Sequence, residues 1–160
     1  MVMVTAQEAN ERSSQGGGVH VLAVAVGWGH CDPAGIVYFP RFFEMFHAAM
    51  ESWFDEALGL PYQELIVGRK LGFPSVHSEA DFRIPTRFGE RVGIELRVAR
   101  LGRSSIDLAY VVRGPDDAVR AVGRTVCAVM DLDPNSPTFH RSRALPEDVR
   151  AAIEAFGSAP

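Results

Sequence analysis

Three side chains that are able to do chemistry stand next to one another in residues 28–41, which read WGHCDPAGIVYFPR. His30, Cys31 and Asp32 are consecutive, and Pro33 and Gly35 follow them closely. Imidazole, thiol and carboxylate groups bind metals, attack carbonyl carbons or move protons. The stretch therefore allows three interpretations: a metal site, a cysteine nucleophile, or a single carboxylate held at the start of a helix.

The spacing of these residues argues against the first two interpretations. Adjacent side chains on an extended segment point in opposite directions, so His30, Cys31 and Asp32 cannot all meet one metal ion. No spacing points to a further ligand such as His47 or His77, and we expect no metal site. A thiolate nucleophile needs a base that takes its proton, and His30 is too close to Cys31 in the sequence to reach it.

The carboxylate interpretation has better support from the surrounding residues. Asp32 precedes Pro33 and Gly35, which favour a tight and rigid turn. A helix that starts a few residues later presents unpaired backbone N–H groups. An acid beside such donors can attack a carbonyl group while the donors polarise its oxygen. The alternative, that Asp32 only caps a turn, remains open on this motif alone.

The segments around this motif show one strand pattern and one long helix pattern. Residues 19–27 are β-branched and mostly apolar, which predicts a buried strand. Residues 40–58 carry large apolar side chains at three- and four-residue spacing, with no break before Gly59 and Pro61. This predicts a long helix with a heavy apolar face. Four of its residues should be almost inaccessible: Phe46, Ala49, Met50 and Trp53.

Four further strand patterns lie in residues 75–84, 91–100, 105–113 and 118–132, and a last helix is predicted at residues 146–156. Turn residues separate the strands, and apolar and polar residues alternate along the first three of them. A period of two with short connections predicts an antiparallel meander that has one buried face.

A heavily apolar helix and a half-buried sheet cover each other's apolar surfaces if the sheet wraps the helix. We therefore expect an α+β chain with the hot-dog fold, in which a five-stranded antiparallel sheet wraps a long central helix. Residues 19–157 should form this single domain, and residues 1–18 a flexible N-terminal tail. Short edge strands favour pairing with a second copy, so we expect at least a dimer.

The composition excludes several classes of function. The chain has 160 residues and a formal net charge of −4, which gives no basic footprint for nucleic acid or a membrane surface. Its two cysteines, Cys31 and Cys127, are far apart and suggest neither a disulfide framework nor a zinc ribbon. No stretch has the apolar length of a membrane span or the pattern of a secretory signal. We expect a cytoplasmic protein without a metal or redox cofactor.

Residues 31–46, CDPAGIVYFPRFFEMF, resemble the signature of the 4-hydroxybenzoyl-CoA thioesterase family of hot-dog enzymes. Members carry a D-P-A-G-I-V-aromatic-aromatic-P run, and this first motif is specific for the family. The resemblance extends through GFPSVHSEADFRIPTRFGERV and LGRSSIDLAYVV and covers residues 20–132. It implies a hydrolase for an aromatic, hydroxybenzoyl-like acyl-CoA, with coenzyme A as part of the substrate, and a homodimer or homotetramer with active sites at the subunit boundary.

The resemblance also implies roles for individual residues. Asp32 matches the catalytic carboxylate, which acts as a nucleophile that forms a mixed anhydride or as a general base for water. The backbone N–H of Phe39 matches the oxyanion donor. Arg103, followed by Ser104, matches a basic position used on CoA phosphates. His47 stands where the 4-hydroxybenzoyl enzyme has an acid that reads the phenol, so it either binds the acyl group or is a core histidine at a subunit contact.

The acyl pocket is expected to suit a flat aromatic ring, with benzoyl-type or phenylacetyl-type thioesters preferred over medium-chain aliphatic ones. Its predicted residues are Phe39, Phe42, Phe73 and His47. Two other functions compete with this one. A hot-dog hydratase for enoyl thioesters would need an Asp-to-His pair at a different spacing, which this sequence lacks. A non-catalytic acyl-CoA-binding regulator would be expected to carry a basic DNA-binding segment, and residues 1–18 are short and not basic.

Overall fold

The computed structural model describes residues 17–157, so residues 1–16 of the predicted tail lie outside it. Gly17 and Gly18 are described, and the Gly18 N–H donates to the Phe156 carbonyl at 2.9 Å. The elements are, in chain order, β1 (His20–Ala25), η1 (Trp28–His30), α2 (Pro40–Ser52), η2 (Trp53–Ala57), η3 (Glu64–Gly68), β2 (Leu71–Gly72), β3 (Ser75–Phe82), β4 (Arg91–Leu101), β5 (Ser105–Arg113), β6 (Val119–Ala128), β7 (Met130–Asp131) and α3 (Glu147–Gly157).

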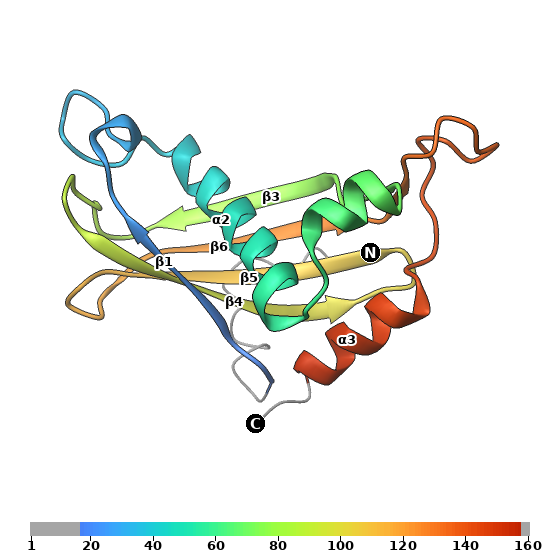
Figure 1. Cartoon of the computed structure of the whole chain (residues 1–160). Coiled ribbons are helices and arrows are strands. Elements are labelled where there is room, and N and C mark those ends of the chain that lie inside the picture. The colour runs from blue at the N-terminus through green and yellow to red at the C-terminus, as the bar shows by residue number, and fades with distance from the viewer. Residues whose placement is uncertain (1–16, 158–160) are drawn as a thin grey trace.

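Five of the strands form one antiparallel sheet in the order β1-β4-β5-β6-β3. The sheet curves around α2, and α3 lies at one end of the molecule (Figure 1). The predicted hot-dog fold is therefore confirmed. A separate two-stranded sheet, β2 with β7, was not predicted because each of its strands has only two residues. Among residues 17–157, no helix has both the length and the apolar character that crossing a bilayer requires.

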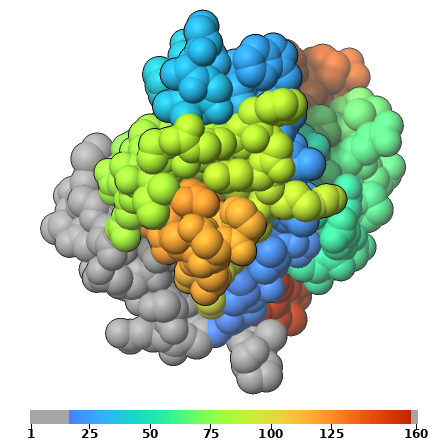
Figure 2. All heavy atoms as spheres, turned by 90° about the vertical axis from the view of Figure 1, so that its left-hand side faces the viewer, coloured from blue at the N-terminus to red at the C-terminus, as the bar shows by residue number. Residues whose placement is uncertain are grey.

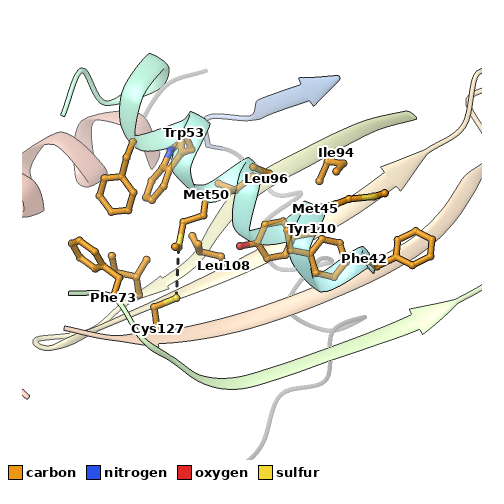
Figure 3. Close-up of a cluster of buried hydrophobic side chains, with 14 of the residues drawn as sticks. Phe42, Met45, Met50, Trp53, Phe73, Ile94, Leu96, Leu108, Tyr110 and Cys127 are labelled. Atoms are coloured by element: carbon orange, nitrogen blue, oxygen red, sulfur yellow. Dashed lines mark hydrogen bonds between the residues drawn. The ribbon is translucent and has the colours of Figure 1, made fainter. Parts of the chain in front are cut away.

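The buried face of α2 packs on the middle of the sheet (Figure 3). Phe46, Ala49, Met50 and Trp53 are at most 1% exposed, as the apolar spacing predicts. The ring of Phe46 stacks on that of Tyr110, with centroids 4.5 Å apart. Gly123 pairs with Tyr110 across the β5–β6 ladder, and a Cβ atom at Gly123 would meet Phe46 at 2.3 Å. The helix and the sheet therefore approach closely because this position has no side chain.

The helical segment ends within one residue of the predicted Leu58. α2 ends at Ser52 and continues directly into η2, which is a π-helical turn with the Leu58 N–H donating to the Trp53 carbonyl. Trp53 and Phe54 are adjacent in the sequence and both are 0% exposed. A π turn changes the direction of successive side chains relative to a regular α-helix, and here it accompanies the burial of both rings.

The two edge strands differ from the prediction. β1 is not a buried strand, since its residues alternate in burial and Val21 is 56% exposed. On β3 the predicted buried face is largely open, because Val76 is 64% and Phe82 48% exposed. α2 contacts β1 and β4 more closely than β3, so one edge of the sheet stays uncovered. Within residues 17–157, β3 pairs only with β6, and no described strand occupies its other edge, which could accept a further strand.

Candidate active site

Asp32 lies in a tight turn between η1 and α2. Its Oδ1 atom accepts a hydrogen bond from the Ala34 N–H at 2.8 Å, and its carbonyl accepts one from the Gly35 N–H at 2.9 Å. Gly35 has a φ of 74°, which a glycine adopts without strain. Asp32 therefore does cap this turn. Only one carboxylate oxygen is used, however, and among the described residues Oδ2 has no hydrogen-bond partner.

The two neighbours of Asp32 are engaged with the backbone of their own loop. The Gly27 N–H donates to His30 Nδ1 at 3.0 Å, so this ring nitrogen is engaged as an acceptor. The Cys31 thiol lies 3.7 Å from the Gly27 carbonyl. Neither side chain forms a hydrogen bond with Asp32. Within the described range, no group of three or more His, Cys, Asp or Glu residues gathers as a metal site.

Phe39 precedes the first residue of α2 and supplies a free backbone donor. Pro40 has no N–H, and the N–H groups of Arg41 and Phe42 donate to the carbonyls of Tyr38 and Phe39. Over the described part of the chain, the Phe39 N–H itself has no acceptor. An unpaired N–H at a helix N-terminus, where the helix dipole is positive, is suited to a developing oxyanion.

Three cavities lie near the start of α2 and along the side of α2 that faces β3. The Asp32 cavity, of about 280 Å³, is lined by Gly29, Cys31, Asp32, Pro33, Tyr38 and Arg41. The aromatic cavity, of about 300 Å³, is lined by Phe39, Phe42 and Phe82 together with Ile36, Val37 and residues 83–86. Figure 2 shows the Asp32 loop at the surface against the segment that follows β3. The Val37 N–H donates to the Thr86 carbonyl and joins these two segments.

The hydroxyl-lined cavity, of about 230 Å³, lies between α2 and the strands β3, β5 and β6. Its lining residues are Phe43, His47, Met50, Ser75, Ser78, Tyr110 and Thr125. Ser78 Oγ lies 3.5 Å from Thr125 Oγ1, and burial raises the pKa of Tyr110 well above its usual range. His47 Nε2 lies 3.0 Å from a Glu51 carboxylate oxygen. One imidazole and several hydroxyl groups therefore face an otherwise apolar space.

The structure separates the four predicted acyl-pocket residues. Phe39 and Phe42 line the aromatic cavity, whereas His47 lines the hydroxyl-lined cavity. Phe73 is 3% exposed, packs against Phe54 at 4.9 Å between centroids, and lines none of the three cavities. The sequence interpretation missed the hydroxyl groups of Ser78, Tyr110 and Thr125. The available signal was Tyr110, a residue with a hydroxyl group among the apolar residues on one face of the 105–113 strand pattern.

Arg103 and Ser104 lie at the opposite end of the molecule from Asp32. β1, which leads into the Asp32 loop, ends at Ala25 beside Arg91, the first residue of β4. Arg103 follows the last residue of β4, Leu101. Ten steps of about 3.3 Å along β4 give a separation of roughly 33 Å. The predicted catalytic carboxylate and phosphate contact of one chain are therefore far apart (Figure 1).

The family model of the thioesterase-like superfamily matches residues 26–153. The chain belongs to this superfamily. A 1,4-dihydroxy-2-naphthoyl-CoA hydrolase of Prochlorococcus marinus (strain MIT 9313) is 31% identical over 147 residues, which cover 86% of this chain and 91% of the relative. The narrower 4-hydroxybenzoyl-CoA thioesterase family stays a prediction.

Two solved structures show the same thioesterase-like architecture. A 1,4-dihydroxy-2-naphthoyl-CoA thioesterase from Synechocystis is similar with a TM-score of 0.74 and 26% identity, covering 85% of this chain and 96% of that chain. A gentisyl-coenzyme A thioesterase is similar with a TM-score of 0.73 and 28% identity, covering 83% of this chain and 98% of that chain.

Proposed function

We propose that the protein is a thioesterase that hydrolyses the CoA thioester of a hydroxylated aromatic acid. Membership of the thioesterase-like superfamily and the names of the relatives support the reaction and the aromatic class. Two observations carry the proposal: Asp32 keeps one carboxylate oxygen free in the loop before α2, and the backbone N–H of Phe39 at the start of α2 is also free.

These two groups are sufficient for thioester hydrolysis. The Phe39 N–H holds the carbonyl oxygen as it gains negative charge. Asp32 Oδ2 then attacks the thioester carbon and expels the CoA thiolate, leaving a mixed anhydride that water hydrolyses to the free acid. Alternatively, Asp32 takes a proton from a water molecule that attacks the same carbon. A thioester is already activated, so neither route requires further catalytic groups.

The acyl group is proposed to lie along α2, in the hydroxyl-lined cavity. Phe39, Phe43 and His47 are four residues apart and share one side of the helix. Along the axis, Phe43 is about 6 Å and His47 about 12 Å from Phe39, at 1.5 Å per residue. A flat ring whose carbonyl group meets the Phe39 N–H therefore extends past Phe43 toward His47 and the hydroxyl groups of the cavity.

This geometry favours a long aromatic acyl group that carries hydroxyl groups. A bicyclic ring spans more of the distance to His47 than a benzoyl ring, and its hydroxyl groups find imidazole and hydroxyl partners. A purely aliphatic chain would cover these polar groups without offering them a hydrogen bond, which disfavours it. The acyl group that the relatives' names print, 1,4-dihydroxy-2-naphthoyl, is therefore the first candidate.

The complete site is proposed to need two copies of the chain. β3 begins at the Arg103 end of the sheet and ends at Phe82, which lines the aromatic cavity beside Phe39. A copy that pairs antiparallel through the free edge of β3 runs in the opposite direction. Its Arg103 end therefore comes to the Asp32 end of the first chain. Pairing would also cover Val76 and Phe82, which are exposed in one chain.

The proposal is tested with a panel of thioesters whose CoA release is followed with a thiol reagent. The order of kcat/KM should be 1,4-dihydroxy-2-naphthoyl-CoA, then gentisyl-CoA, then benzoyl-CoA, with octanoyl-CoA last. His47→Leu should lower kcat/KM for the first substrate by about 10–100-fold, since a lost hydrogen bond to a buried hydroxyl costs roughly 1–3 kcal/mol. Octanoyl-CoA is the internal control and should change little.

Two results would contradict this proposal. Preference for octanoyl-CoA would refute the aromatic acyl group while leaving the reaction intact, and no hydrolysis of any thioester would refute the reaction. Light scattering at micromolar concentration tests the assembly: the mass should be at least twice the 17.5 kDa of one chain. A monomer of full activity would show that one chain holds a complete site.

A further inference from the structure

The Asp32 cavity holds a cation as well as the proposed catalytic carboxylate. Among the residues that line it, Asp32 is the anion and Arg41 the cation. The side chain of Arg41 is 41% exposed, so it is partly shielded from water. Arg41 forms its ion pair with Glu44, and across residues 17–157 no oxygen of Asp32 lies within 4.0 Å of its guanidinium. The charges of Asp32 and Arg41 therefore line one space without neutralising each other.

Arg41 is held in place at both ends of its side chain. Its backbone N–H donates to the Tyr38 carbonyl at 2.9 Å in the first turn of α2. Its Nη1 atom donates to both carboxylate oxygens of Glu44, each at 2.7 Å. An arginine has five N–H donors, and among the described residues the Nε and Nη2 groups of Arg41 have no acceptor. The guanidinium is therefore oriented and still able to bind a negative charge.

The geometry of the helix places Arg41 and the proposed acyl group on different sides of Phe39. The acyl group is proposed to run along Phe43 and His47, on the side of α2 that they share with Phe39. Each residue turns a helix by about 100°, so Arg41 lies about 200° around the axis from Phe39. An acyl group and its sulfur lie on either side of their carbonyl carbon. With the carbonyl oxygen at the Phe39 N–H, the sulfur is therefore directed toward the side of Arg41.

We infer that Arg41 is a further catalytic residue, which stabilises the CoA thiolate as it leaves. Asp32 Oδ2 forms a bond to the carbonyl carbon, the carbon–sulfur bond breaks, and the electron pair of that bond stays on the sulfur. The free N–H groups of Arg41 meet this negative charge as it develops. If water attacks instead, with Asp32 taking its proton, the sulfur leaves with the same electron pair. The thiolate takes up a proton from solvent after release.

The inference rests on the proposed function, and its test compares one acyl group, 1,4-dihydroxy-2-naphthoyl, on CoA, N-acetylcysteamine and thiophenol. The constant kcat/KM covers the steps up to release of the thiol, so it contains the proposed step. Arg41→Gln should lower kcat/KM by about 10–100-fold for CoA and N-acetylcysteamine. The loss should be less than about threefold for thiophenol, because its aromatic ring already stabilises the thiolate.

Two variants serve as controls for this comparison. Arg41→Lys keeps the positive charge and should recover most of the kcat/KM that Arg41→Gln loses with CoA. Arg97→Gln removes an arginine from β4 that does not line the Asp32 cavity, and it should react as the wild type does. Thermal melts confirm that each variant is folded.

The pattern across the three thiols decides the inference. An equal loss for all three would show that Arg41 only holds the helix or the acyl group. A loss confined to CoA would show that Arg41 contacts the phosphates, which the other two thiols lack. Either result overturns the inference while the proposed function stands, and so does turnover by Arg41→Gln at the wild-type rate.

A titration of bound CoA requires no turnover and therefore separates the inference from the proposed function. It uses Asp32→Asn, which removes the opposing negative charge, and follows the ultraviolet absorbance of the thiolate. The pKa of the bound CoA thiol should be lower than that of free CoA by roughly one unit or more, and adding Arg41→Gln should abolish this difference. A bound thiol with the pKa of free CoA overturns the inference. Failure of the wild type to hydrolyse any thioester overturns the proposed function, and the titration still decides the role of Arg41.

Discussion

Replacing Gly123 by alanine should destabilise the protein by forcing α2 away from the sheet. The added Cβ atom would lie 2.3 Å from Cε2 and 2.4 Å from Cζ of Phe46. Carbon atoms in contact are about 3.5–4.0 Å apart, so the ring must move by more than about 1 Å. It has little room, because Tyr110 stacks on it at 4.5 Å and Phe43 packs at 5.9 Å between centroids.

Overpacking of this kind costs about 1–3 kcal/mol. For a chain of this size a loss of about 2 kcal/mol lowers Tm by about 4–8 °C. Differential scanning calorimetry measures the change, and Gly157→Ala is the matched control, since a Cβ atom there meets nothing within 4 Å. Turnover should also fall, because Phe46 belongs to the helix that carries the Phe39 N–H and His47.

A double-mutant cycle isolates the contact. The Phe46→Leu variant is itself destabilised, but in that background Gly123→Ala should cost less than in the wild type, with a coupling of about 0.5–3 kcal/mol. A Gly123→Ala protein as stable as the wild type would refute this reasoning. So would strict additivity with Phe46→Leu, because the clash would then lie elsewhere.

Two further predictions concern titratable groups. Because hydrogen bonds lower the pKa of Asp131 from 3.8 to about 2, they stabilise the fold above about pH 4, and this contribution disappears as the pH falls toward 2. In urea titrations Asp131→Asn should therefore have a lower free energy of unfolding than the wild type at pH 7. This difference between the two proteins should become smaller below pH 4, and a difference that stays constant with pH would contradict the prediction. Burial raises the pKa of Cys127 to about 11, so a thiol reagent at pH 8 should modify the half-buried Cys31 first and Cys127 only on unfolding, and equal rates for both thiols would contradict it.

Local patterns in the sequence were enough to predict most of the fold. The spacing of Phe46, Met50 and Trp53 predicts a buried helix because a helix places them on one face whatever surrounds it. Burial of the edge strands was less predictable. Val76 and Phe82 alternate as core residues do, yet they are exposed in one chain because the helix leaves β3 uncovered. An alternating pattern in the sequence does not show whether the helix or a partner chain covers the apolar face of a strand.

The candidate site, too, could be predicted only in part. Asp32 and the Phe39 N–H lie within eight residues of each other, so one continuous motif predicts both. The hydroxyl-lined cavity, in contrast, requires the ladder register that places Ser78 opposite Thr125 on β6. Composition and spacing within single segments carry no information on that register. The same limit explains why the sequence predicts Arg103 as a phosphate contact without showing that it lies at the opposite end of the molecule from Asp32.

The kinetics of Asp32→Asn test the central claim most directly. Asparagine keeps an oxygen that can accept the Ala34 N–H, so the turn and Tm should be nearly unchanged. It removes the nucleophile or base, so kcat for 1,4-dihydroxy-2-naphthoyl-CoA should fall by roughly 10²–10⁴, with KM little changed. Cys31→Ser and His30→Gln, the matched controls in the same loop, should each cost less than about tenfold. Near wild-type turnover by Asp32→Asn, or loss of turnover in Cys31→Ser instead, would contradict the account.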